Sequence, residues 1–216
     1  MNFPNKKYNI IYADPPWYFK SYSKKGENRN ATKHYPCMVF DDLCNLPVGD
    51  IADLDCVLFL WVTDPFLERS LELIKRWNFS YKTVAFTWIK RNKSDKSDKS
   101  DKLDKSDKSD KLDKLDRSDR SDRSDRSDRS DRSDSYFTGL GYWTRANPES
   151  CLLATKGHPK RISRSVRQLV VKVRQEHSKK PDCVRDRIVQ LMGDLPRIEL
   201  FARQKTPGWD VWGNEV

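Results

Sequence analysis

The chain has 216 residues and a formal net charge of +10, from 42 lysines and arginines against 32 aspartates and glutamates. This length suits one domain with a full hydrophobic core, and the charge points either to an anionic partner, most commonly nucleic acid, or to a solvated basic surface. The five cysteines form no C-x-x-C pair and no apolar run is long enough to cross a bilayer, so composition argues against a metal centre and a membrane protein, and predicts a cytoplasmic chain in a reducing compartment.

The first half of the chain alternates strand and helix patterns. Residues 8–13 form a short apolar run, and residues 56–63 form a second run that is almost continuously apolar, as a buried parallel strand is. Pro65 then opens a segment that continues to Trp77, and its apolar residues fall on one helical face. Residues 81–90 are rich in β-branched and aromatic side chains, which predicts another strand.

Residues 93–134 have a different composition. They form fourteen successive triplets of Lys or Arg, then Ser or Leu, then Asp, so the tract is neutral and the whole net charge lies on the other 174 residues. Ser and Asp are poor helix formers, and only three leucines are available to pack. We expect a mostly disordered insertion in a surface loop, with an arm that touches phosphates as the alternative. The prediction is one domain over residues 1–216, interrupted at 93–134.

The second half returns to the alternation of strands and helices. Residues 150–155 and 168–173 are predicted strands, residues 181–192 a helix that Gly193 stops, and residues 197–201 a last strand. This rhythm predicts an α/β fold of the doubly wound, Rossmann-like kind, with helices on both faces of the sheet. In such sheets, ligands bind beyond the carboxyl ends of the strands.

The stretch ADPPW follows the first predicted strand and occupies that position. Pro15 and Pro16 donate no hydrogen bonds and hold the chain extended, which leaves their carbonyls pointing outward. Asp14 adds an acceptor-only carboxylate, and Trp17 adds a flat face on which a ring can stack. Methylation of an exocyclic amine requires such groups, because its lone pair is delocalised until acceptors hold its hydrogens. The alternative is a proline-rich turn with Asp14 as a local cap.

Further motifs support the first interpretation. They are HYPCM at 34–38, FLWVTDP at 59–65, TWIK at 87–90, GLGYWTRANPESCLLATKG at 139–157, HSKKPD at 177–182, RIELFAR at 197–203 and WGNE at 212–215. With IIYADPPW, they make the chain similar to the adenine N-6 methyltransferase family. This family includes the catalytic subunit of the messenger-RNA adenosine methyltransferase and short DNA adenine methyltransferases. The short length and the sequence GLGYWTRAN favour the phage and bacterial DNA branch.

The resemblance implies S-adenosylmethionine as methyl donor, with the catalytic motif near the start of the chain and the donor-binding residues near its end. The implied catalytic residues are Asp14, Pro15, Pro16 and Trp17, and the implied donor-binding residues are Asp14, Lys180, Glu199, Phe201, Arg203, Asn214 and Glu215. Lys180 matches a lysine near the donor's carboxylate, and Glu199 and Arg203 match residues near its ribose. Position 215 is Glu where the messenger-RNA enzymes carry Gln. The Glu215 carboxylate would therefore only accept hydrogen bonds from the ribose, and not donate them.

Contacts with the target polymer are predicted from the resemblance and from basic residues that lie beside aromatic ones. The expected substrate-binding residues are Tyr35, Lys90, Tyr142, Trp143, Arg145 and Arg164. Basic residues from Arg145 to Arg167, with Tyr142 and Trp143 just upstream, suit a groove that follows a nucleic-acid backbone with one base turned out of the stack. A solvated basic face is the alternative.

Two functions stay open at this point. The first is a DNA adenine N-6 methyltransferase, in the host cytoplasm if a phage encodes it, with RNA as the less favoured polymer. The second is an inactive relative that serves as a nucleic-acid-binding subunit. The intact D-P-P-W motif favours the first, and the oligomeric state stays open.

Overall fold

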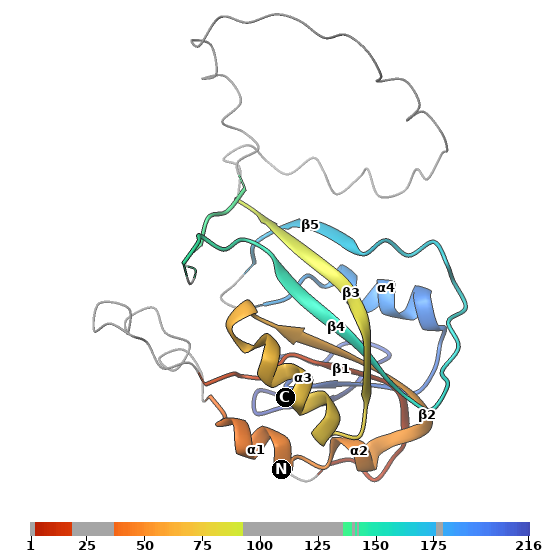
Figure 1. Cartoon of the computed structure of the whole chain (residues 1–216). Coiled ribbons are helices and arrows are strands. Elements are labelled where there is room, and N and C mark those ends of the chain that lie inside the picture. The colour runs from red at the N-terminus through yellow and green to blue at the C-terminus, as the bar shows by residue number, and fades with distance from the viewer. Residues whose placement is uncertain (1–2, 19–36, 93–135, 140, 142, 176–178) are drawn as a thin grey trace, which may run out of the picture.

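A computed structural model describes residues 3–18, 37–92, 136–139, 141, 143–175 and 179–216. Its centre is one seven-stranded sheet in the order β5-β3-β4-β2-β1-β6-β7 (Figure 1). The strands are β1 (Tyr8–Ala13), β2 (Ala52–Val62), β3 (Ser80–Arg91), β4 (Glu149–Lys156), β5 (Leu169–Val173), β6 (Arg197–Leu200) and β7 (Asp210–Trp212). The helices of the described residues are α1 (Phe40–Asn45), α2 (Val48–Ile51), the 3-10 helix η3 (Asp64–Phe66), α3 (Leu67–Arg76) and α4 (Cys183–Met192).

Strand direction decides which residues can meet. β1 pairs in parallel with β2 and β6, β6 with β7, and β3 with β5, whereas β4 lies antiparallel between β2 and β3. The carboxyl ends of β1, β2, β3 and β6 therefore meet at one edge of the sheet, which we call the site end. Because β4 is antiparallel, it starts at the site end with Glu149 and finishes at the opposite edge, the far end, with Lys156.

The residues of β1 show that both faces of the sheet are covered. Ile11 and Ala13 belong to the core that α1, α2 and α3 cover, while Ile10 and Tyr12 belong to the core that α4 covers. Neighbouring residues of a strand face opposite sides, so an apolar run without alternation is suited to a sheet with helices on both faces. This arrangement confirms the predicted Rossmann-like α/β fold.

The observed elements follow the predicted ones closely. β1 has the predicted bounds, and the predicted strands at 81–90, 150–155, 168–173 and 197–201 and the helix at 181–192 are each confirmed to within two residues. β2 begins four residues earlier than predicted, because two aspartates among its first four residues interrupt the apolar pattern. α1, α2 and β7 were not predicted, since elements of three to six residues are too short to show a period. Among the described helices, none is both long and apolar enough to cross a membrane.

The chain on the two sides of the repeat tract meets at the site end. Arg91 forms a bridge with Tyr136, and the Phe137 amide donates to the Lys90 carbonyl at 2.9 Å. Asn92 Nδ2 also lies 3.5 Å from the Tyr136 carbonyl. The predicted disorder of residues 93–134 lies outside the described residues, but the chain enters and leaves the tract at one place on the sheet.

Candidate active site

The turn after β1 places three acceptors at the site end. The Pro15 carbonyl accepts a hydrogen bond from the Trp17 amide at 2.9 Å, and the Pro16 carbonyl accepts one from the Met38 amide at 2.9 Å. Both carbonyls are thus engaged inside the chain, a detail that the sequence did not indicate, although each oxygen keeps a second lone pair. The Asp14 side chain keeps 28% exposure and lines the adjoining cavities.

Trp17 packs inside the core. Its ring stacks on Phe66, with 5.3 Å between the centroids and 13° between the planes, and only 9% of the residue is exposed. Within the described residues, its buried Nε1 has no hydrogen-bond partner. Because Phe66 covers one ring face, the geometry favours a role for Trp17 in holding the turn. Its role as a stacking face for the target base stays a prediction.

Four charged side chains form a line that begins at Asp14, which we call the charge line. Lys180 Nζ donates to Asp14 Oδ2 at 2.7 Å and lies 3.3 Å from Glu149 Oε2. Lys90 Nζ donates to Glu149 Oε1 at 2.6 Å. The side chains of Lys180, Glu149 and Lys90 are at most 16% exposed. Because the signs alternate, each of these charges contacts an opposite one, which buried charges require.

Burial and pairing act in opposite directions on the charge line. Burial raises the pKa of Asp14 above its ordinary value, Lys180 opposes this shift and Glu149 adds to it. Burial also acts to raise the pKa of Glu149, but Lys180 and Lys90 outweigh it and hold that pKa below its ordinary value. Burial acts to lower the pKa of Lys180, but Asp14 and Glu149 raise it overall, so Lys180 keeps its charge.

Asn147 fixes the β3 end of the charge line. Its Oδ1 accepts from the Lys90 amide at 2.9 Å, and its Nδ2 donates to the Lys90 carbonyl at 2.9 Å and to the Phe137 carbonyl. A side-chain amide that pairs with both backbone groups of one residue replaces a missing strand partner. The Lys90 backbone is therefore held where β3 extends past the start of β4.

A second buried ion pair lies between α4 and β6. Arg185 Nε and Nη2 donate to the two carboxylate oxygens of Glu199 at 2.7 and 2.8 Å, and Arg185 Nη1 donates to Asp182 at 2.7 Å. This two-bond geometry is the strongest form of an arginine–carboxylate contact. Since both oxygens of Glu199 already have a partner, a ribose contact by Glu199 would use its remaining lone pairs, and it stays a prediction.

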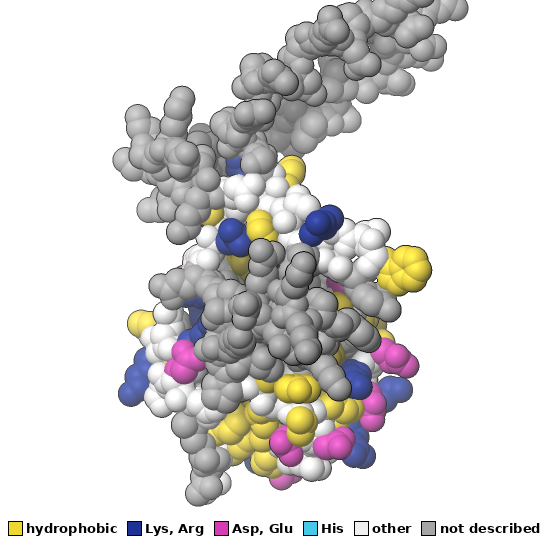
Figure 2. Space-filling model, turned by 90° about the vertical axis from the view of Figure 1, so that its left-hand side faces the viewer, with side chains coloured by type: hydrophobic (Ala, Val, Ile, Leu, Met, Phe, Trp, Pro, Cys, Tyr) yellow, Lys and Arg dark blue, Asp and Glu magenta, His cyan; other side chains and the backbone are white. Residues whose placement is uncertain are grey.

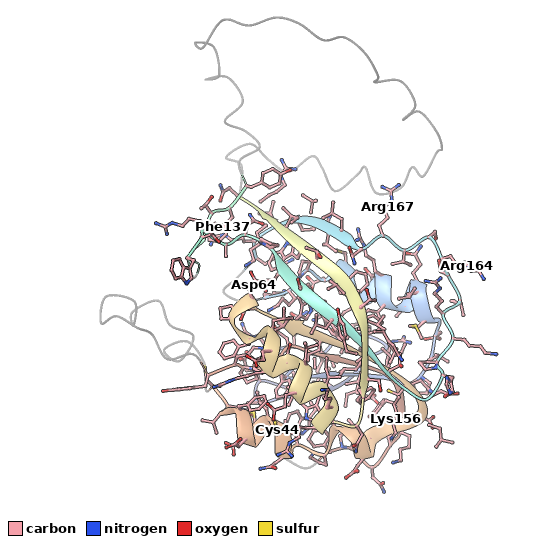
Figure 3. The ribbon with its side chains drawn as sticks, in the orientation of Figure 1. Cys44, Asp64, Phe137, Lys156, Arg164 and Arg167 are labelled. Atoms are coloured by element: carbon pink, nitrogen blue, oxygen red, sulfur yellow. The ribbon has the colours of Figure 1, made fainter. Side chains whose placement is uncertain are left out.

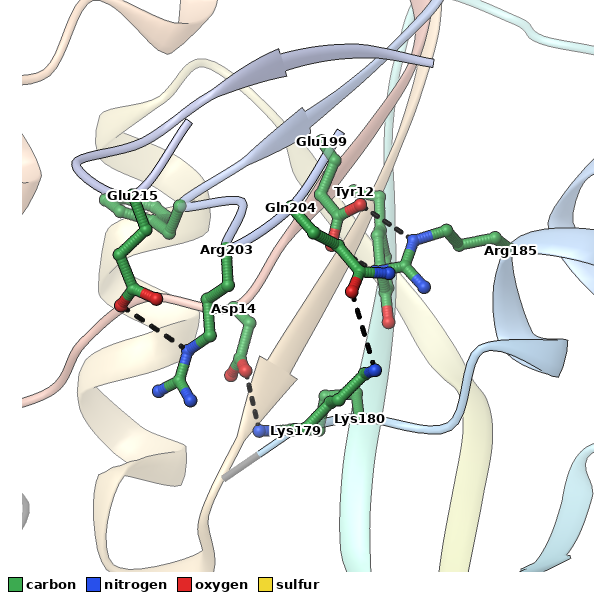
Figure 4. A pocket seen from close by; sticks show the side chains of 10 residues that line it. Tyr12, Asp14, Lys179, Lys180, Arg185, Glu199, Arg203, Gln204 and Glu215 are labelled. Atoms are coloured by element: carbon green, nitrogen blue, oxygen red, sulfur yellow. Dashed lines mark hydrogen bonds and ion pairs between the residues drawn. The ribbon is translucent and has the colours of Figure 1, made fainter. Parts of the chain in front are cut away.

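Two adjoining cavities open beside Asp14. The first has a volume of about 170 Å³ and the second about 200 Å³. Charged side chains from the turn after β1, from α4, from β6 and from the loop before α4 converge on the first cavity, as Figure 4 shows. The residues that line both cavities are Asp14, Phe201, Arg203 and Glu215. The structure thus brings most of the predicted donor-binding residues together, and Asn214 lines the second cavity.

Tight backbone packing forms the wall of the second cavity. Phe201 has φ 61°, a left-handed conformation that is uncommon for residues other than glycine. The Ala202 amide donates to the Trp212 carbonyl at 3.0 Å, and a Cβ at Gly213 would lie 2.4 Å from the Ala202 oxygen. The glycine of the WGNE motif therefore allows the turns after β6 and β7 to touch.

Three residues of the site were missed by the sequence interpretation. Glu149 and Asn147 stand inside a motif that carried the resemblance, yet neither received a role. An amide and an acid on either side of a proline, at the start of a predicted strand, were an available signal. Arg185 lies on the buried face of a predicted helix, where a charged residue signals a buried partner.

The predicted substrate-binding residues fall into separate places. Lys90 belongs to the charge line. Trp143 is 94% exposed, and with Arg145 it lies in a loop that the Gly139 amide closes by donating to the Ala146 carbonyl at 2.8 Å. Tyr35 and Tyr142 lie outside the described residues.

Arg164 lies away from this loop. β4 carries the chain to Lys156 at the far end, and the Ile162 amide then donates to the Leu191 carbonyl in the last turn of α4, at 2.8 Å. Figure 3 shows Arg164 and Arg167 on the opposite side of the molecule from Phe137. On the face in Figure 2, acidic and basic side chains are interspersed around a group of hydrophobic side chains in the lower part. The length of β4 therefore separates Arg145 from Arg164, and a groove along Arg145 to Arg167 stays a prediction.

Comparison with known proteins gives a consistent result. The MT-A70 family matches residues 8–112 and 131–215. The chain is 33% identical over 230 residues to the Type II methyltransferase M.MunI of Mycoplasma sp, and the alignment covers 99% of this chain and 79% of that protein.

The eukaryotic relatives are longer proteins. The chain is 24% identical over 214 residues to the N(6)-adenosine-methyltransferase catalytic subunit METTL3 of Homo sapiens, covering 97% of this chain and 28% of that protein. It is 34% identical over 90 residues to the N6-adenosine-methyltransferase non-catalytic subunit MTB of Arabidopsis thaliana, covering 41% of this chain and 11% of that protein. The chain thus spans only a small part of the length of these two relatives.

Proposed function

Since the chain belongs to the MT-A70 family, we propose that it transfers a methyl group from S-adenosylmethionine to the exocyclic amino group (N6) of adenine in DNA. One observation carries the proposal: the Asp14 carboxylate ends β1 at a point shared by two cavities, and Lys180 supports its charged form from 2.7 Å. This position leaves room for the donor in the cavities while the Asp14 carboxylate faces the target amine.

The chemistry asks the protein for hydrogen-bond acceptors. When bound, S-adenosylmethionine would supply an electrophilic methyl group: N6 would take the methyl carbon as the sulfur–carbon bond breaks, which leaves S-adenosylhomocysteine, and one proton from N6 would pass to solvent. Asp14 accepts one N–H of the target amine, and the second lone pair of the Pro15 carbonyl accepts the other. Holding both hydrogens directs the nitrogen lone pair out of the ring, and such oriented acceptors lower the barrier without a strong base.

The donor-binding role of the cavities has independent structural support. Trp212 lines the second cavity and adds an aromatic side chain to its wall. Lys180 offers a cation for the donor's carboxylate, and Asn214 and Glu215 offer polar groups for its ribose. Phe201 lines both cavities and provides an apolar surface for the adenine ring.

DNA is the proposed polymer because a Type II methyltransferase covers the chain almost completely at 33% identity, whereas METTL3 matches at 24% and is several times longer. RNA is retained as a comparison in the test. A purely binding role, suggested by the match to a non-catalytic subunit, is less favoured, because this chain keeps Asp14 beside the cavities.

The test is methyl incorporation from labelled S-adenosylmethionine into unmethylated DNA of varied sequence and into RNA. We expect incorporation into DNA at N6 of adenine. Asp14→Ala should lower the rate by roughly 100-fold to 1000-fold, because it removes an acceptor aimed at the reacting amine. The matched control is Asp64→Ala, which removes an exposed aspartate that also precedes a proline after a strand. Nucleic-acid binding without incorporation by the unaltered protein would reject the proposal.

A further inference from the structure

We propose that Glu149 is a positioning residue, which competes with Asp14 for Lys180 and so sets how freely the Asp14 carboxylate accepts a hydrogen bond from the target amine. The inference rests on the proposed function for the role of Asp14. For the role of Glu149 it rests on contacts within the charge line.

Lys180 has two carboxylates within reach. Its Nζ lies 2.7 Å from Asp14 and 3.3 Å from Glu149, and it also lies 5.6 Å from the centre of the Trp61 ring. An ammonium group carries three donors, so it can serve both carboxylates at once. With only 9% of the Lys180 side chain exposed, water competes little for these donors. The two carboxylates therefore share the positive charge of Lys180, and movement of Nζ toward one lengthens its contact with the other.

Glu149 is held from its other side, and Lys180 is not part of a regular element. Lys90 binds the second oxygen of Glu149 at 2.6 Å, Asn147 fixes the Lys90 backbone, and β4 pairs Glu149 with Trp88 of β3. Lys180 belongs to neither a strand nor a helix and precedes Pro181. Glu149 is thus the fixed partner, and the Lys180 side chain is the group whose position shifts between the two carboxylates.

The charged groups around Asp14 act on it in known directions. Lys180 and Arg203 favour its ionised form, Glu149 disfavours it, and the buried Cys151 thiol lies close enough to interact with it. A carboxylate that is fully engaged with an ammonium is a weaker acceptor for a third group. By drawing Lys180 away, Glu149 leaves Asp14 a stronger acceptor and a stronger base.

Two isosteric or near-isosteric changes should therefore act in opposite directions. Glu149→Gln leaves Lys180 to Asp14 alone, so the acid limb of the pH profile of kcat/KM should move to lower pH by about one unit, with kcat reduced about tenfold. Lys90→Gln leaves Glu149 to attract Lys180 more strongly, so the acid limb should move to higher pH. Neither Glu149 nor Lys90 makes a hydrogen bond to Asp14 in the described contacts.

The experiment measures pH profiles of methyl transfer for the unaltered protein, Glu149→Gln and Lys90→Gln. Lys6→Gln is the matched control. The ion pair between Lys6 and Asp210 has the same 2.7 Å length as the ion pair between Lys180 and Asp14, but it is exposed and lies at the start of β7. A melting curve for each variant reports whether it folds. If Glu149→Gln does not fold, the direction of the Lys90→Gln shift alone decides the question.

The outcomes separate this inference from the proposed function. Opposite shifts in the two variants, with Lys6→Gln unchanged, support the positioning role. Acid limbs that stay in place or move in the same direction, in an active protein, overturn it. If the unaltered protein transfers no methyl group, the proposed function fails. In that case the positioning role of Glu149 fails with it, because there would be no target amine from which Asp14 could accept a hydrogen bond.

Discussion

The two ends of β4 carry charge in different ways. At the site end, Glu149 is buried between Lys90 and Lys180, which contact carboxylates at 2.6 to 3.3 Å. At the far end, Lys156 Nζ donates to the backbone carbonyls of Gly49 and Ala52 at 3.0 and 3.3 Å, and the arginines that follow are exposed. Buried charges depend on their partners, whereas exposed ones are screened by water and salt. The burial of charged side chains, more than the net charge of +10, therefore identifies the region where the loss of one charge has the largest effect on its neighbours.

The largest expected difference between the buried and the exposed charges is in the free energy of unfolding after the removal of one arginine. Arg185→Met should lower the free energy of unfolding by about 3 to 5 kcal/mol, because it leaves the buried Glu199 carboxylate without its two hydrogen bonds. Arg164→Met at the exposed segment should change it by less than about 0.5 kcal/mol. Denaturant melts measure both. Equal losses in the two variants would show that burial does not separate the two regions.

Acid should lower the stability of the site end before that of the far end. The pKa of Glu149 lies below its ordinary value of 4.5, so Glu149 contributes stability that is present above pH 4.5 and is lost as the pH falls through its folded-state pKa. The melting temperature of Glu149→Gln should therefore lie below that of the unaltered protein at neutral pH, and the gap should narrow below pH 4.5. Melting temperatures across this range provide the check, and a gap that stays constant would contradict the pairing of Glu149.

Salt dependence of DNA binding sharpens the comparison further. If the nucleic acid lies at the site end, Arg145→Ala should flatten the plot of log affinity against log salt by about 0.9 for one lost phosphate contact on duplex DNA. Arg164, which the sequence suggested as a substrate-binding residue, lies beyond the length of β4, so Arg164→Ala should leave the slope closer to that of the unaltered protein. Binding isotherms at several salt concentrations decide this, and the reverse order would place the polymer at the far end.

The smallest effect is expected from removal of the repeat tract. Asn92 and Tyr136, on either side of residues 93–135, are already joined at the site end, so a short Gly/Ser bridge can replace the tract without moving β3 or β4. The melting temperature and the affinity for S-adenosylmethionine should stay within error of the full chain. A large drop in melting temperature would show that the tract packs against the domain.

Much of the fold was predictable because its central pieces are long and regular. β1 and the following Asp14 were located from an apolar run that ends in two prolines, and Gly193 gave the end of α4. Short elements escaped, since the six residues of α1 and the three of β7 carry no period. The fold class followed from the order of the long elements alone.

The site was only partly predictable, because its contacts depend on strand direction. Glu149 meets Asp14 through Lys180 only because β4 is antiparallel, and no pattern within β4 indicates this. The same eight-residue strand, about 26 Å long at 3.3 Å per residue, separates Arg145 from Arg161 and Arg164. Nearness in sequence is thus no measure of nearness in space for these basic residues, and the basic groove stays a prediction.

The four residues shared by the two cavities have a thermodynamic consequence. Asp14, Phe201, Arg203 and Glu215 cannot adjust to a ligand in one cavity without changing the wall of the other. If each cavity takes its own ligand, any factor by which the first ligand alters the affinity for the second also applies to the first ligand in the presence of the second. Titrations of one ligand in the presence of the other would measure this coupling free energy.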